Sequence, residues 1–67
     1  MRRKKPEQIR DKILYHLRAH GPATAMVLEQ IVGVHRRTIS KYLGELDDLG
    51  LIEVDNPKIP KTWRAAL

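Results

Sequence analysis

The amphipathic period of residues 36–49 constrains the fold of this chain more than any other feature of its sequence. Five apolar side chains fall at offsets of 0, 3, 4, 7 and 10 from the first, which places them on one face of a helix. They are Ile39, Tyr42, Leu43, Leu46 and Leu49. Gly50 follows directly and predicts the end of the helix. The opposite face is polar and mostly basic, so we expect this helix to cover a core with one side and to leave the other in solvent.

Two further helices and a hairpin are predicted from local signals. Pro6 suits a first helical turn and Gly21-Pro22 ends a helix, so we expect a helix at about residues 6–20. Thr24 is a good N-cap and Gly33 closes a second, shorter helix at about residues 25–32. Residues 51–54 and 62–66 are typical of strands joined by the turn-rich residues 55–61, and residues 22–24 could add a third short strand.

The length of the chain limits what these elements can build. Its 67 residues suffice for one domain with a thin core, and the absence of cysteine excludes a disulfide framework. We therefore predict a mainly helical α+β domain over residues 6–67, with a three-helix core and a small antiparallel hairpin. A basic N-terminal arm precedes it over residues 1–5. Because a chain of this size has little room for a buried catalytic pocket, we do not expect an enzyme.

The charge of the chain is unevenly distributed. The net charge of +5 divides into +7 over residues 1–41, −5 over residues 42–57 and +3 over residues 58–67. Within the first part, the cations concentrate at residues 2–5 and at Arg36, Arg37 and Lys41, with no acid among either group. A balance of this kind favours a polyanionic partner, although it does not determine the fold.

The connection between the second and third predicted helices is typical of a known structural motif. A three-residue turn that contains Gly, here residues 33–35, is the connection of a helix-turn-helix. The run from Thr24 through Arg36-Arg37-Thr38-Ile39-Ser40 to Leu43, with Leu46-x-x-Leu49-Gly50-Leu51-Ile52 after it, resembles the winged helix-turn-helix DNA-binding domains of small transcriptional regulators. The resemblance covers roughly residues 7–66. It implies a winged helix whose hairpin, the wing, touches the DNA backbone or minor groove.

Three groups of side chains are predicted to contact DNA. In a helix-turn-helix, the N-terminal residues of the second helix reach base edges in the major groove. Arginine can bind guanine with two hydrogen bonds, lysine suits phosphate, and short hydroxyl side chains suit either. The wing and the N-terminal arm supply further cations for the backbone. The predicted DNA-binding residues are Arg36, Arg37, Thr38, Ser40 and Lys41 on the helix, Lys58, Lys61 and Arg64 around the wing, and Arg2, Arg3, Lys4 and Lys5 in the arm.

The layout is also similar to that of the Z-alpha domains, which bind left-handed DNA. The shared positions are Thr24, Ala25, Leu28, Gly33, Arg36, Arg37, Ile39, Gly50, Pro60 and Trp63. Three positions depart from the Z-alpha pattern. Ser40 replaces an Asn, Gly44 replaces a Tyr that packs on a Z-form guanine, and Pro60-Lys61 replaces two adjacent prolines. The departures favour right-handed duplex DNA, with Z-form nucleic acid as an alternative.

A protein–protein interaction module within a larger assembly is the alternative from another class, because a fold does not determine a function. The helix at residues 25–32 keeps it open. Met26, Val27 and Ile31 lie off its main apolar stripe, either as additional core or as a contact for a second copy or a partner. Tyr15 is a second candidate for such a surface. The basic face of the third helix favours DNA.

The remaining features predict no cofactor. His16 and His20 are one helical turn apart, a spacing that can hold a metal, but no third ligand is evident. No apolar run approaches the ~18–20 residues of a membrane span, so we expect no membrane partner. We expect a small transcriptional regulator that binds double-stranded DNA as a homodimer or larger assembly, because one module offers few base contacts. Its predicted location is the cytoplasm, at the nucleoid, or the nucleus if the chain is eukaryotic.

Overall fold

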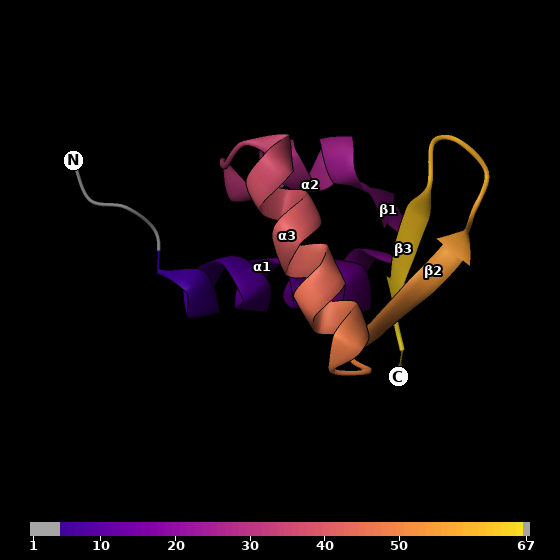
Figure 1. Cartoon of the computed structure of the whole chain (residues 1–67), viewed down its shortest axis with the longest axis horizontal. Coiled ribbons are helices and arrows are strands. Elements are labelled where there is room, and N and C mark those ends of the chain that lie inside the picture. The colour runs from indigo at the N-terminus through magenta and orange to yellow at the C-terminus, as the bar shows by residue number, and fades with distance from the viewer. Residues whose placement is uncertain (1–4, 67) are drawn as a thin grey trace.

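A computed structural model describes residues 5–66 of the chain, and Figure 1 shows their arrangement. The elements in chain order are α1 (Pro6–His20), β1 (Ala23–Thr24), α2 (Ala25–Val32), α3 (Arg36–Asp48), β2 (Ile52–Asn56) and β3 (Thr62–Ala65). The helices gather on one side and the hairpin of β2 and β3 extends on the other (Figure 1). This is a winged helix, the fold that the sequence predicts.

The three helices begin and end close to where their local signals place them. Thr24 caps α2, since its hydroxyl oxygen accepts a hydrogen bond of 3.2 Å from the backbone N–H of Val27. Gly33 ends α2 in the left-handed conformation, with a φ of 80°. α1 and α2 have the predicted bounds, and α3 ends at Asp48, one residue earlier than expected.

The end of α3 differs from the prediction at Leu49. Leu49 is 66% exposed, so its assignment to the buried face of α3 is wrong. The backbone N–H of Gly50 donates to Asp47 and that of Leu51 to Leu46, over 2.9 and 3.0 Å. These bonds end the helix through a positive φ of 76° at Gly50. Leu49 therefore lies at a corner, at the edge of the apolar face and beyond the core.

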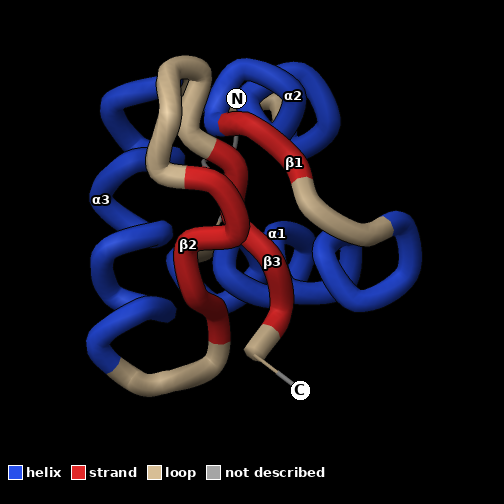
Figure 2. The backbone as a smooth tube through the Cα atoms, turned by 90° about the vertical axis from the view of Figure 1, so that its right-hand side faces the viewer, coloured by secondary structure: helices blue, strands red, loops and turns tan. Residues whose placement is uncertain are grey.

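The strands form a three-stranded antiparallel sheet in the order β1-β3-β2, which Figure 2 shows beside the helices. Trp63 on the central strand pairs with Ala23 of β1 and with Val54 of β2. The third short strand predicted at residues 22–24 is therefore present. β2 runs to Asn56, two residues further than predicted, because Asn56 pairs with Thr62 across an irregularity in the register.

The core lies between the three helices and the inner face of the sheet. Val34, in the turn between α2 and α3, and Trp63 are half-buried and pack against its edge. Met26, Val27 and Ile31 are 52%, 40% and 45% exposed, so the alternative that they are additional core is wrong. None of the helices in the described part of the chain is long and apolar enough to cross a membrane. The buried residues are Ile9, Ile13, Leu17, Ala23, Leu28, Val32, Ile39, Tyr42, Leu43, Leu46 and Ile52.

Candidate nucleic-acid interface

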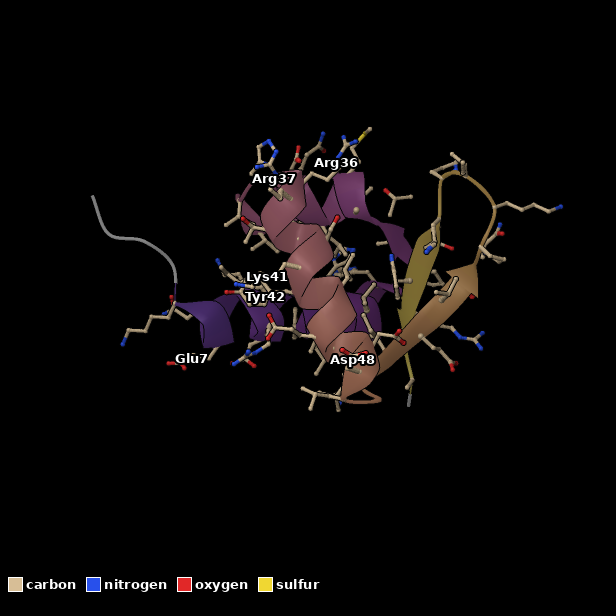
Figure 3. All side chains as sticks on the ribbon, in the orientation of Figure 1. Glu7, Arg36, Arg37, Lys41, Tyr42 and Asp48 are labelled. Carbon is tan, nitrogen blue, oxygen red and sulfur yellow. The ribbon has the colours of Figure 1, made fainter. Side chains whose placement is uncertain are left out.

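The first turn of α3 is set by an unusual N-cap, His35. The Nδ1 atom of His35 accepts a hydrogen bond of 3.1 Å from the backbone N–H of Arg37. The cap satisfies one of the backbone N–H groups that a helix start leaves without a partner. Arg36 and Arg37 follow it directly, and Figure 3 shows both at the end of α3 that lies beside α2. The cap thus determines where the basic face of α3 begins.

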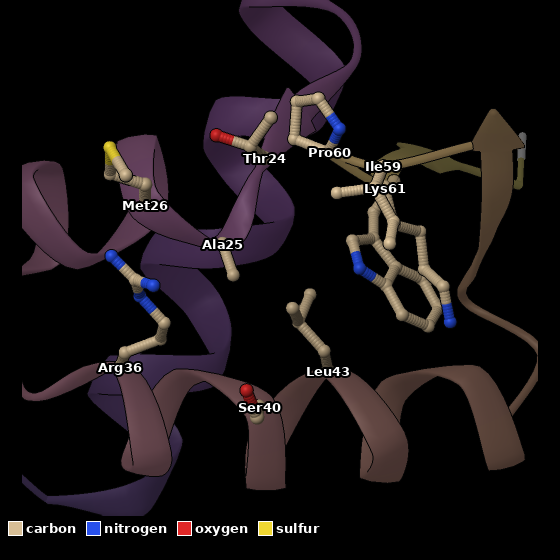
Figure 4. A pocket seen from close by; sticks show the side chains of 10 residues that line it. Thr24, Ala25, Met26, Arg36, Ser40, Leu43, Ile59, Pro60 and Lys61 are labelled. Atoms are coloured by element: carbon tan, nitrogen blue, oxygen red, sulfur yellow. The ribbon is translucent and has the colours of Figure 1, made fainter. Parts of the chain in front are cut away.

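A groove runs from the start of α3 to the wing, and we name it the α3–wing groove. It has a volume of about 550 Å³. Figure 4 shows its lining side chains, which come from the end of β1 and the start of α2, from α3, from the tip of the hairpin and from β3. The lining residues are Thr24, Ala25, Met26, Arg36, Ser40, Leu43, Ile59, Pro60, Lys61 and Trp63.

Two cations stand on opposite walls of the α3–wing groove. Arg36 lies on the α3 wall, where its Nε is 3.7 Å from a carboxylate oxygen of Glu29 on α2. Lys61 lies on the wing wall, where its Nζ is 5.2 Å from the centre of the Trp63 ring. Both side chains are exposed, so their charges remain accessible to a ligand. The hydroxyl of Ser40 lies on the helix wall near Leu43 (Figure 4).

Arg37 and Lys41 are exposed on the outer side of α3 and do not line the groove. Within residues 5–66, neither makes a salt bridge. The Nζ of Lys41 lies 5.5 Å from the centre of the Tyr42 ring, and the guanidinium of Arg10 lies 5.9 Å from the same ring. The basic surface of α3 therefore continues around the helix toward α1. Thr38, also predicted to contact DNA, is half-buried and does not line the groove.

The wing cations do not all face the groove. Lys58 is exposed at the turn, where its backbone N–H donates to Oδ1 of Asn56 over 2.9 Å. Arg64 is bound across the hairpin to Glu53 at 2.7 Å and to Asp55 at 3.4 Å. It lines a separate depression that includes Arg18. The structure therefore places Arg64 apart from the α3–wing groove.

The predicted N-terminal arm is mostly beyond what the structure shows. Arg2, Arg3 and Lys4 lie outside the described residues. Lys5 is exposed at the start of α1, and its backbone N–H donates to Oε1 of Gln8 over 3.2 Å. Lys5 thus belongs to the cap of the helix as well as to the arm.

Sequence reasoning did not place Met26 and Ile59 at the groove, although it named Met26 as a possible contact for a partner. Met26 is 52% exposed and Ile59, at the wing tip, is 97% exposed, and both line it beside the cations. Only the position of Ile59 in a proline-rich turn hinted at its exposure. The contact between Glu29 and Arg36 was also missed, because it joins two helices whose relative placement is not visible in the sequence.

The two histidines of α1 lie away from this groove. Their rings are 4.9 Å apart, centre to centre. Burial and, secondarily, the neighbouring His20 lower the pKa of His16 below its ordinary value. Among residues 5–66, no group of three potential ligand side chains that could hold a metal ion is found.

The geometry defines the class of the protein as a winged helix. No family model and no curated protein matches the chain. Among solved structures, the chain is similar to the crystal structure of the Zalpha domain from Carassius auratus PKZ in complex with Z-DNA. The two structures superpose with a TM-score of 0.81 and share 25% sequence identity, over 90% of this chain and 95% of that chain. The similarity confirms the predicted fold and the resemblance to Z-alpha domains.

Proposed function

We propose that this chain binds duplex DNA through the α3–wing groove and the adjoining basic surface of α3. The observation that carries the proposal is the placement of Arg36 and Lys61 on facing walls of one groove. Two cations across a groove suit a phosphate-bearing strand, because phosphate contacts supply most of the affinity in such complexes. Arg37 and Lys41 extend the cationic surface beside the groove, where they can hold the neighbouring backbone.

The C-terminal half of α3 limits how the helix meets DNA. Asp47 and Asp48 are exposed at that end of α3, and Figure 3 shows Asp48 at the end opposite to Arg36 and Arg37. Carboxylates repel phosphates, so the ligand lies against the first two turns of α3 and crosses to the wing. The hydroxyl of Ser40 is within this region and can bond a phosphate or a base edge.

We further propose the biological setting that this interface fits. The chain acts as a small transcriptional regulator at the nucleoid, or in the nucleus if it is eukaryotic. Residues 6–67 form its DNA-binding domain, and residues 1–5 form a basic arm. One winged helix makes few base contacts, so two or more copies bind neighbouring half-sites. Duplex DNA is the partner, and no small-molecule cofactor takes part.

Left-handed DNA is a second candidate ligand. It is favoured by the similarity to a Zalpha domain that was crystallised with Z-DNA. Pro60 and Trp63, shared with the Z-alpha pattern, both line the α3–wing groove. Ser40 and Gly44 depart from that pattern on α3, and an added Cβ at Gly44 would meet nothing within 4 Å. The chain thus keeps two residues of the Z-alpha pattern in its groove without the aromatic side chain that packs on the Z-form guanine.

Fluorescence anisotropy with a labelled mixed-sequence duplex tests the interface. The double variant Arg36→Ala/Arg37→Ala is expected to weaken binding and to reduce the log–log salt slope by about 1.8, since each phosphate contact contributes ~0.9. Circular dichroism of the free variant shows whether the helices are intact. Unchanged affinity and slope in a folded variant would refute the proposed interface.

Circular dichroism of an alternating CG duplex separates the two ligands. If the wild-type chain binds left-handed DNA, the duplex spectrum inverts on addition of the protein, and Arg36→Ala/Arg37→Ala shows a weaker inversion. If the spectrum does not invert although anisotropy shows binding, the ligand is right-handed DNA. The two results are mutually exclusive at the same salt concentration.

A further inference from the structure

A second surface, formed by α1 and α2, combines exposed apolar side chains with a hollow. Tyr15 is 69% exposed on α1, and Ile31 is 45% exposed on α2. Val27 lies one turn before Ile31 on the same side of α2 and is 40% exposed. Beside them is a hollow of about 440 Å³, which we name the α1–α2 hollow. Its lining residues are Asp11, Lys12, Tyr15, His16, His20 and Ile31.

This surface has both an exposed aromatic side chain and a hollow, the two parts that a self-complementary contact needs. Tyr15 is a protruding aromatic side chain on the rim of a hollow that is large enough for an aromatic ring. The imidazoles of His16 and His20, whose planes are tilted by 30° to each other, and the side chain of Ile31 form its walls. In a two-fold contact, the same patch is used twice, so a protruding group beside a hollow on one copy meets the hollow on the other. Tyrosine suits this role because it buries a large ring and keeps a polar hydroxyl at the edge.

The charges around the hollow also suit a second copy of the chain as the binding partner. The whole chain carries a net charge of +5, so two copies repel each other over most orientations. Around the α1–α2 hollow, however, one acid, Asp11, stands next to one base, Lys12. A two-fold axis through this rim brings each Asp11 to the Lys12 of the other copy and removes the repulsion locally.

We propose that two copies of this chain associate through the α1–α2 hollow, with the Tyr15 ring of each copy in the hollow of the other. The pairs Asp11 with the partner's Lys12 and Lys12 with the partner's Asp11 flank the two rings. None of the residues that line this hollow lines the α3–wing groove, so association leaves both grooves open. The proposal therefore stands independently of the ligand of that groove.

Analytical ultracentrifugation of the full chain without nucleic acid tests this interface. Because the patch is small, we expect a dimer with a dissociation constant in the micromolar range. Tyr15→Ala is expected to weaken the dimer by about tenfold or more, since buried tyrosines carry much of the energy of an interface. Leu49→Ala removes an equally exposed apolar side chain, 66% against 69%, outside the patch and leaves the constant unchanged. A wild-type chain that stays monomeric at millimolar concentration, or a Tyr15→Ala variant that associates as tightly as wild type, overturns the proposal.

A charge-exchange experiment tests the two-fold arrangement itself. Asp11→Lys and Lys12→Asp are both exposed substitutions, and each alone places like charges opposite each other in the dimer. Each variant is therefore expected to associate more weakly than wild type. An equimolar mixture of the two variants restores both opposite-charge pairs and associates more tightly than either alone. A mixture no tighter than its components overturns the two-fold contact, whether or not Tyr15→Ala has an effect.

Discussion

At the residue scale, His35 determines how α3 starts. Its Nδ1 accepts from the N–H of Arg37 over 3.1 Å. His35→Ala removes this acceptor and is expected to reduce the free energy of unfolding by about 1 kcal/mol, the usual cost of losing an N-cap. His35→Asn keeps a short acceptor and is expected to recover most of the loss. Urea unfolding followed by circular dichroism measures both, and equal losses in the two variants would show that the cap is not the cause.

His16 makes the stability of the fold sensitive to pH. Burial first, and the neighbouring His20 second, lower its pKa in the folded chain. The unfolded chain therefore takes up the proton more readily. The stabilisation is present above the unfolded pKa of about 6.5 and is lost as the pH falls from there through the lower, folded pKa.

Thermal unfolding between about pH 5 and pH 7.5 measures this dependence. The wild-type chain is expected to melt at a lower temperature at the acid end. His16→Gln is expected to flatten the dependence, and His20→Gln to flatten it less, because the charge of His20 is the smaller cause. A His16→Gln variant whose melting temperature falls with pH as steeply as that of wild type would assign the effect to other groups.

At the element scale, a glycine in the interior of α3 lowers the stability of the helix. Gly44 lies in the helix interior, and an added Cβ there would have no heavy atom within 4 Å. Gly44→Ala is therefore expected to raise the free energy of unfolding by about 0.5–1 kcal/mol, since alanine loses less backbone entropy in a helix. Urea unfolding measures the gain. A destabilised variant would mean that the backbone at Gly44 is not free to accept a side chain.

Each lysine of the wing is expected to contribute separately to the salt dependence of DNA binding. Lys58→Ala and Lys61→Ala should each reduce the log–log salt slope for duplex binding by ~0.9. Arg18→Ala removes the same charge from α1, away from both the α3–wing groove and the α1–α2 hollow, and should leave the slope unchanged. Anisotropy titrations at several salt concentrations give the three slopes. Equal reductions in all three variants would show that binding responds to total charge and not to the wing.

The elements were predictable from the sequence where their signals are local. Pro6, Gly21 and Gly33 act within a turn of where they stand, so the bounds of α1 and α2 follow from the residues alone. Interactions between distant residues were not predictable. The extent of β2 depends on the pairing of Asn56 with Thr62, and the exposure of Leu49 depends on how the chain turns after α3.

The candidate interface divides in the same way. The basic start of α3 could be recognised from the sequence because its cations are adjacent and lie opposite an apolar stripe. The acidic partners of the predicted DNA-binding cations could not be recognised from the sequence. Arg64 was predicted as a DNA contact from its charge alone, but in the sheet Glu53 lies directly across from it. Glu29 likewise approaches Arg36 only through the packing of α2 beside α3.

At the scale of the whole molecule, the fold turns the alternation of basic and acidic segments along the chain into separate surfaces. The basic residues 36–41 and the basic wing tip are separated in sequence by the acidic residues 42–57. Folding brings Arg36 of the first and Lys61 of the second into the lining of the α3–wing groove. It directs three of the five acids into salt bridges with Arg10 and Arg64. A ligand in the groove therefore meets two cations, Arg36 and Lys61, that the acidic residues 42–57 separate in the sequence.

Two charge-matched variants separate the effect of the groove from that of net charge. Arg36→Ala/Arg37→Ala and Arg18→Ala/Arg64→Ala each remove two positive charges, but Arg18 and Arg64 share a depression on another face. If the ligand binds at the groove, only the first variant loses affinity and salt slope, because long-range attraction is screened within about 10 Å at 0.1 M salt. Anisotropy with one duplex compares the two directly. Equal losses would mean that the whole molecule attracts DNA without a defined face.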